Sequence, residues 1–204
     1  MKFDKILNSK FSLLVTGFVL TGLIGSFLSY QFQNISWKRQ ARFEIAKRQI
    51  EQAKSSIDET LLLARERFYA MQKVFWTLEN SKSDIADQWW NEYYKIKDEW
   101  NIMVGEYRSK IKIFVDPMLA YELLDRDDAR NYPKKESLHA IFVVAHYKLK
   151  QLFEYAGKNS EERFKIEKEA LNALSELGDN LGDFSDSCYK IYLKKYDLLK
   201  NICN

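Results

Sequence analysis

The chain has 204 residues, of which 46% are hydrophobic and 30% are charged, and its formal net charge is +3. This length fits one domain with its own core, and this balance of apolar and charged residues excludes a disordered chain. Beyond the first ten residues the chain holds 29 of the 32 basic and 28 of the 29 acidic side chains, and this even balance predicts no nucleic-acid partner.

The N-terminal region contains one long uncharged segment. No charged residue stands between Lys10 and Lys38, and residues 11–32 read FSLLVTGFVLTGLIGSFLSYQF. A helix of this length crosses a hydrocarbon core of about 30 Å. A cleaved signal peptide is the alternative, but no pair of small residues follows the apolar run at the spacing that a signal peptidase needs, since Ser26 would pair with Leu28. The sequence therefore predicts an uncleaved anchor.

This anchor divides the chain into three parts. We expect a basic tail over residues 1–10, a transmembrane helix over residues 11–32 and a helical-bundle domain over residues 33–204. An interfacial aromatic belt is expected where the span ends, at Tyr30, Phe32 and Trp37.

One face of the expected span carries small residues. Gly17, Thr21 and Gly25 recur every four residues. Small residues at this spacing let a second helix approach closely, so these three are candidates for packing against a partner span. The alternative is that glycine is simply tolerated in membrane helices.

The residues that lead out of the span carry a resemblance. In the run GFVLTGLIGSFLSYQFQNISWKRQ, residues 17–40, a Thr and a Gly within the span are followed by a Gln and then by a Trp with basic neighbours. This run resembles the membrane-exit pattern of uncharacterised bacterial single-pass proteins, and it covers about a tenth of the chain. The resemblance implies a bacterial inner-membrane protein and implies no activity.

The orientation of the span follows from charges and cysteines. Three lysines precede the span and five basic residues follow within about 20 positions, which favours a cytoplasmic C-terminal domain. Export of a short tail with three lysines is awkward, however, and this argues for the opposite orientation. Cys188 and Cys203 in one helix would lie about 22 Å apart, too far for a disulfide. Unpaired cysteines favour a reducing compartment, so a cytoplasmic domain is slightly preferred.

Apolar residues step by three and four positions along the first part of the domain, which indicates a long helix with a coiled-coil-like seam. Two successive steps of four, at residues 53, 57 and 61, are typical of a stutter that unwinds a supercoil locally. The seam residues are Phe43, Ala46, Ile50, Ala53, Ile57, Leu61, Ala64, Phe68, Met71, Phe75 and Leu78.

Breaks in the later pattern predict the remaining helices. A polar break at residues 80–83 precedes a helix that reaches Val115, and Asp116 with Pro117 is expected to cap and start the next one. Further helices are expected over 117–130, over 136–156 with Gly157 as C-cap, from residue 159 or 160 to Gly178, and over 183–202. The predicted fold is all-α, an antiparallel bundle built on a long hairpin over residues 43–115, with shorter helices over 117–202 packed on it.

The second helix of this hairpin is rich in aromatic residues. Its segment QWWNEYYKIKDEWN, residues 88–101, is amphipathic at helical spacing: Trp89, Tyr93 and Trp100 fall in one band, and Trp90 with Tyr94 widens the band to nearly half the circumference. Packing in the core is the preferred interpretation, and a partner or ligand surface is the alternative. The open question is whether Trp90 and Tyr94 are covered by this chain or by another.

The sequence predicts no catalytic residue, cofactor or metal ligand. His139 and His146 lie seven positions apart, and we expect them at the margin of the core because the ligand spacings typical of zinc sites are missing. Acidic clusters at residues 125–128 and 179–186 lack the pattern of a calcium loop and are expected to cap helices or form turns. The sequence also contains no phosphate-binding glycine loop, and no serine or cysteine with a recognisable activating partner.

Two functions remain in view. The first is a non-enzymatic, membrane-anchored bundle that acts as an interaction or scaffold component, with a protein partner or a second copy of the chain. The second is a membrane-anchored sensor whose aromatic helix lines a small-molecule pocket between helices.

Overall fold

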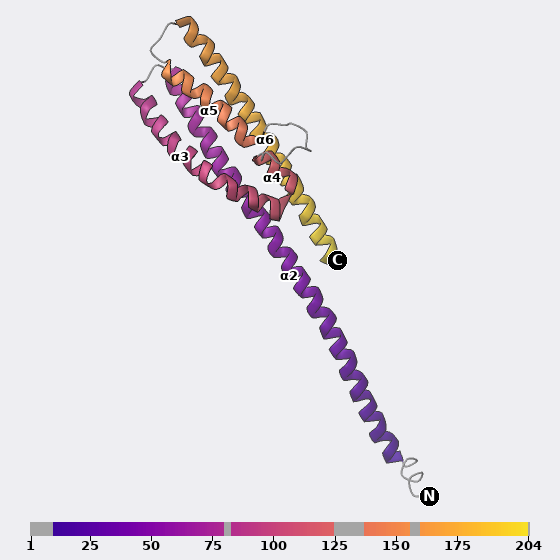
Figure 1. Cartoon of the computed structure of the whole chain (residues 1–204). Coiled ribbons are helices and arrows are strands. Elements are labelled where there is room, and N and C mark those ends of the chain that lie inside the picture. The colour runs from indigo at the N-terminus through magenta and orange to yellow at the C-terminus, as the bar shows by residue number, and fades with distance from the viewer. Residues whose placement is uncertain (1–9, 80–82, 125–136, 156–159, 204) are drawn as a thin grey trace. The chain divides into compact units, whose positions relative to one another are not determined.

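The computed structural model of the chain describes residues 10–79, 83–124, 137–155 and 160–203 (Figure 1). These residues are helical almost throughout, and no strand occurs among them, so the predicted all-α class is confirmed. The elements are α2 (Lys10–Glu79), α3 (Ser83–Lys110), the π-helix η1 (Ile111–Val115), α4 (Pro117–Leu123), α5 (Leu138–Glu154) and α6 (Ser160–Cys203).

The chain divides into two compact units, residues 1–47 and residues 48–202. The described part of the first unit, residues 10–47, is the N-terminal part of α2. Near the N-terminus, α2 is long and apolar enough to cross a membrane. None of the residues in its most apolar stretch is buried within the chain. Tyr30, Phe32 and Trp37, the predicted belt, are all exposed.

The second unit contains an antiparallel bundle in which α2, α3, α5 and α6 run side by side (Figure 1). Neighbouring helices run antiparallel, as the contacts show: residue numbers rise along one helix while those of the contacted residues fall along the other, as for Tyr93–His146 and Trp100–His139. The joining contacts are Lys110–Glu59 between α3 and α2, Tyr93–His146 and Trp100–His139 between α3 and α5, Lys148–Glu169 between α5 and α6, and Tyr189–Asp58 between α6 and α2.

The predicted seam on α2 forms one wall of the core of this bundle. From Ala53 to Leu78 its residues are buried, apart from Phe68, which is half-buried. Phe43, the expected start of the seam, lies in the first unit and is exposed, so the part of the seam before residue 48 remains a prediction. Supercoiling of the seam, and the stutter in it, remain predictions.

The end of the predicted hairpin carries the expected cap. Asp116 is the N-cap of α4, where its carboxylate accepts hydrogen bonds from the main-chain N–H groups of Met118 and Leu119, and Pro117 takes the first helical position. The last turn before this cap is a π-helix, because the N–H of Asp116 donates to the carbonyl of Ile111, five residues back.

Two of the predicted helix ends are wrong. The structure ends α4 at Leu123 rather than near residue 130, because Leu124 is extended and its carbonyl accepts a hydrogen bond of 3.0 Å from Arg108 Nε. The rest of that prediction, like the expected C-cap at Gly157, lies outside the described residues. The second error concerns Gly178, where α6 continues without a break to Cys203.

Gly178 serves packing and not termination. A Cβ built on it would lie 3.1 Å from Phe68 Cζ, so the missing side chain lets α6 approach α2 closely. Gly182, one turn further along, has nothing within 4 Å of the same position. The expected shorter helices over 160–202 are therefore one helix of 44 residues, which is longer than α3 with its 28.

These two glycines give a matched test of the packing. Gly178→Leu should lower the free energy of unfolding by about 1–3 kcal/mol, because the new side chain overpacks against Phe68. Gly182→Leu should raise it by about 0.5–1 kcal/mol, because leucine favours a helix over glycine and meets open space. Urea unfolding of the full chain in detergent measures both values. Equal effects at the two positions would contradict the packing role of Gly178.

Candidate functional site

The aromatic residues of α3 are divided between the core and its margin. Tyr93 and Trp100 are fully buried, Trp90 is 9% exposed, and Trp89 and Tyr94 are half-buried. All five predicted positions therefore pack on the core of the second unit. The preferred interpretation of the segment as a packing helix fits this arrangement.

Trp90 is covered by this chain. Its ring stacks on Phe153 of α5, with centroids 4.8 Å apart and planes 10° from parallel. It also stacks at 6.0 Å on His146 and meets Tyr94 edge to face at 5.3 Å. Such aromatic pairs contribute about 0.5–1.5 kcal/mol each beyond the apolar area that they bury. Trp90 is therefore covered by α5, whose residues lie more than 50 positions further along the sequence.

The two histidines of α5 form hydrogen bonds with this aromatic helix. Trp100 Nε1 donates to His139 Nδ1 at 3.0 Å, and the Tyr93 hydroxyl lies 2.8 Å from His146 Nδ1. An indole N–H is a donor only, so His139 Nδ1 carries no proton and the ring is neutral, with its proton on Nε2. The predicted place of the histidines at the core margin is confirmed, since both are half-buried.

Sequence reasoning missed these hydrogen bonds, although one signal was present. Tyr93 and Trp100 lie seven positions apart, and so do His139 and His146. Equal spacing on two antiparallel helices allows both pairs to form at once, because seven residues make nearly two full turns. Only knowledge that α3 and α5 are neighbours turns the two spacings into a contact.

Arg67 of α2 is the residue that sequence reasoning did not single out. Its side chain is only 1% exposed, in the middle of the bundle. The guanidinium carbon lies 4.5 Å from the ring centre of Phe142 and 5.9 Å from that of Trp100. Its Nε and Nη1 atoms are buried and have no hydrogen-bond partner among the described residues.

The balance of energies at Arg67 is unfavourable. Burying an unpaired ion costs several kcal/mol, and each cation–π contact returns about 0.5–2 kcal/mol. Burial lowers the pKa of Arg67, and the only group that opposes this effect is the phenol of Tyr93. Burial in turn raises the pKa of Tyr93 to about 12. No carboxylate of the described residues pairs with Arg67.

A second feature lies on the outside of α2 and α3. Leu62, Tyr69 and Trp76 recur every seven residues on α2 and are 61%, 53% and 46% exposed. Lys73 Nζ lies 5.0 Å from the ring centre of Tyr69 and 5.6 Å from that of Trp89, so Tyr69 and Trp89 share one face across the two helices. We call Leu62, Tyr69, Trp76 and Trp89 the outer face.

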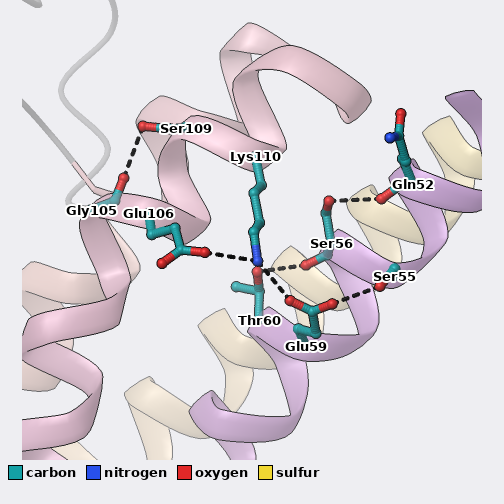
Figure 2. A network of polar contacts seen from close by, with 9 residues as sticks. All are labelled: Gln52, Ser55, Ser56, Glu59, Thr60, Gly105, Glu106, Ser109 and Lys110. Carbon is teal, nitrogen blue, oxygen red and sulfur yellow. Dashed lines mark hydrogen bonds and ion pairs between the residues drawn. The ribbon is translucent and has the colours of Figure 1, made fainter.

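A polar cluster at the C-terminal end of α3 joins this helix to α2 (Figure 2). Lys110 Nζ lies 2.9 Å from a carboxylate oxygen of Glu59 and 2.9 Å from one of Glu106. Hydrogen bonds from Ser55 and then Lys110 hold the pKa of Glu59 below its usual value. These groups are partly exposed, so the cluster contributes little free energy to the contact between the two helices.

The predicted small-residue stripe lies on the N-terminal part of α2. Thr21 Oγ1 donates to the carbonyls of Gly17 and Phe18, and a Cβ at Gly17 or Gly25 would meet nothing within 4 Å in this chain. Packing of this stripe against a partner span remains a prediction.

Cys188 is buried and free, and burial raises the pKa of its thiol to about 12, which makes it unreactive. The side chain of Cys203 lies outside the described residues.

Metal chemistry finds no support in the described part of the chain. It contains no group of three or more His, Cys, Asp and Glu side chains placed to hold an ion. The acidic residues 179, 183 and 186 lie within α6 and do not cap a helix, so that expectation is wrong, because the helix does not end there. The cluster at residues 125–128 lies outside the described residues.

The neutral histidines predict sensitivity to acid. Burial, and then the charges of Lys97, Arg67 and Lys150, lower the pKa of His146 from 6.5 to about 4. The unfolded chain takes up a proton near pH 6.5, whereas the folded chain resists it down to about pH 4. Stability is therefore fully present above pH 6.5 and is lost as the pH falls through this window.

His146→Asn tests this dependence, because asparagine keeps an acceptor and does not titrate. Between pH 7 and pH 5 the unchanged chain should lose about 1–2 kcal/mol of unfolding free energy, a value that allows for the partial exposure of the ring. The variant should show a flatter profile over the same range in urea unfolding. Parallel profiles would mean that His146 is not the responsible group.

Comparison with known proteins provides no identification. No family model, no curated protein and no solved structure matches this chain. Its function is therefore inferred from its own residues and their geometry.

Proposed function

We propose that the protein is a non-enzymatic, membrane-anchored helical bundle that binds a protein partner through the outer face of α2 and α3. Three large apolar side chains at a spacing of seven on one helix are the observation that carries this proposal. The same spacing lets a partner helix pack along all of them at once. Large apolar side chains that stay exposed on one face of a helix are candidates for a protein interaction site.

The core supports this assignment by elimination. The aromatic residues of α3 that seemed available for a partner pack instead on α5, as the stack of Trp90 on Phe153 shows. Trp89 is the exception, since it is half-buried beside Lys73 at the edge of the outer face. The proposed binding surface therefore lies on α2 with Trp89, and not on the α3 aromatic residues that the sequence offered as the alternative to core packing.

The location is part of the proposal. The N-terminal part of α2 serves as a single span in a bacterial inner membrane, with the bundle on the cytoplasmic side. Five basic residues after the span and a buried, unpaired Cys188 support this orientation. An anchor confines the chain to a plane and raises its effective concentration near a membrane-bound partner.

A second candidate function is a sensor for a small ligand in the bundle interior. The specific observation in its favour is Arg67, a buried cation with two unpartnered nitrogen atoms. Buried polar groups in native proteins are normally satisfied, and an unsatisfied one marks a position where function overrides stability.

Photocrosslinking tests the outer face in native membranes. A photoreactive residue at position 69 should give a crosslinked product, whereas the same residue at position 171 should not. Leu171 on α6 is a matched control, because it is 52% exposed against 53% for Tyr69. Crosslinking at both positions or at neither would contradict the proposal. Two differently tagged copies of the chain distinguish a second copy from another protein.

A charge on the outer face should abolish the interaction. Tyr69→Lys should lose the crosslink formed from position 76 and leave the free energy of unfolding within about 0.5 kcal/mol, because the side chain is exposed. Leu171→Lys should keep the crosslink. Retention of the crosslink in Tyr69→Lys would show that the contact lies elsewhere.

The orientation is tested by fusions after Asn204. A phosphatase that folds only in the periplasm should be inactive there, and a fluorescent protein that matures in the cytoplasm should be bright. The opposite pair of results would place the bundle in the periplasm. A fusion that lacks residues 11–32 provides the cytoplasmic reference, since it has no span to carry it across.

A further inference from the structure

A second apolar row lies on α3 beside the outer face. Ile96 and Met103 follow Trp89 at steps of seven, and all three are half-buried against the core. Seven residues make nearly two turns, so the three side chains lie along one side of α3. Trp89 marks this side as the one that adjoins α2, because Lys73 Nζ of α2 lies 5.6 Å from its ring centre. The outer face is therefore continued by apolar side chains across the boundary between the two helices.

Acidic side chains also recur every seven residues along this boundary. The row on α2 is Glu59 and Glu66, and the row on α3 is Glu92, Glu99 and Glu106. Lys110 Nζ lies 2.9 Å from a carboxylate oxygen of Glu59 and 2.9 Å from one of Glu106, so the two rows face the same boundary (Figure 2).

The other three carboxylates form no ion pair with any of the described residues. Glu66 and Glu99 are exposed, and Glu92 is half-buried. Of the nearest lysines, Lys73 lies over the rings of the outer face, and Lys95 of α3 pairs with neither Glu92 nor Glu99. We call Glu66, Glu92 and Glu99 the acidic edge of the outer face.

The acidic edge discriminates between the possible occupants of this face. A second copy of the chain, bound through the same face, would bring its own acidic edge against this one, and opposed like charges weaken association. An anionic lipid surface is repelled for the same reason. A helix that carries lysine or arginine beside its apolar residues is instead attracted by these carboxylates, because flanking charges select the partner in helix–helix contacts.

We propose that the partner of the outer face is a protein that contributes a basic amphipathic helix, with apolar residues at a spacing of seven and lysine or arginine beside them. Its apolar residues would pack on Tyr69 of α2 and Ile96 of α3, and its cations lie within reach of Glu66 and Glu99. This inference rests on the proposed function and names the chemical class of the partner.

The test uses the crosslink formed from position 69 in native membranes. Glu66→Lys combined with Glu99→Lys should lower its yield about tenfold or more, because each change sets like charges against each other. Glu176→Lys combined with Asp179→Lys is the matched control, since both acids are exposed on α6 and the change in charge is the same. This control should leave the yield unchanged. Both double variants should stay within about 1 kcal/mol of the unchanged chain in urea unfolding.

A second measurement requires no charge reversal. The yield of the crosslink should fall as the salt concentration is raised from about 50 to 500 mM, because salt screens attraction between exposed charges. A contact made by apolar side chains alone does not weaken with salt, so a constant yield would contradict the basic partner.

Mass spectrometry of the crosslinked product then identifies the attached segment. This segment should hold more lysine and arginine than aspartate and glutamate, with apolar residues at helical spacing. A product with an acidic segment, with the outer face of a second copy or with lipid would overturn the proposal, as would a yield that survives the reversal at Glu66 and Glu99. A product that persists in this way leaves the outer face in place, whereas the absence of any product from position 69 contradicts both proposals.

Discussion

Two hydrogen bonds between α3 and α5 determine the interior of the bundle. The pairs Tyr93–His146 and Trp100–His139 form together because both helices repeat their polar groups after seven residues. A slip of one helix by a single turn would break both hydrogen bonds and leave the polar groups of the buried Tyr93 and Trp100 without these partners, at a cost of about 1–3 kcal/mol each. The register of the two helices is thus fixed by polar contacts, whereas apolar packing alone would tolerate alternatives.

The same pairs create the surroundings of Arg67. Because each histidine is neutral and already hydrogen-bonded, it can stand near a buried cation without repulsion. Protonation of either ring would place a second positive charge beside the guanidinium. The predicted acid sensitivity thus originates in a polar interior that has no buried carboxylate among the described residues.

Helix α2 carries apolar side chains on two faces, one buried in the bundle and one exposed. Its seam, from Ala53 to Leu78, packs on the other helices, and its stripe of Leu62, Tyr69 and Trp76 stays exposed at the same time. A helix with two apolar stripes can bind a partner without rearrangement of its core. Such an arrangement fits the proposed function, in which the bundle stays folded both with and without a partner.

The sequence by itself determined the features that depend on helix periodicity and on the cap at Asp116. Steps of three and four predicted the long helices, and Asp116 with Pro117 predicted the start of α4, because helix periodicity and capping act over a single turn. The tertiary structure decided the rest. Gly178 lies inside α6 rather than at its end, and a glycine fits there because Phe68, 110 positions away in the sequence, occupies the space a side chain would take. Trp90 is buried because α5 returns to cover it, and Arg67 lacks a counter-ion because the helices that surround it bring aromatic rings and neutral histidines. These outcomes depend on which helices become neighbours, and that is set by packing over the whole bundle.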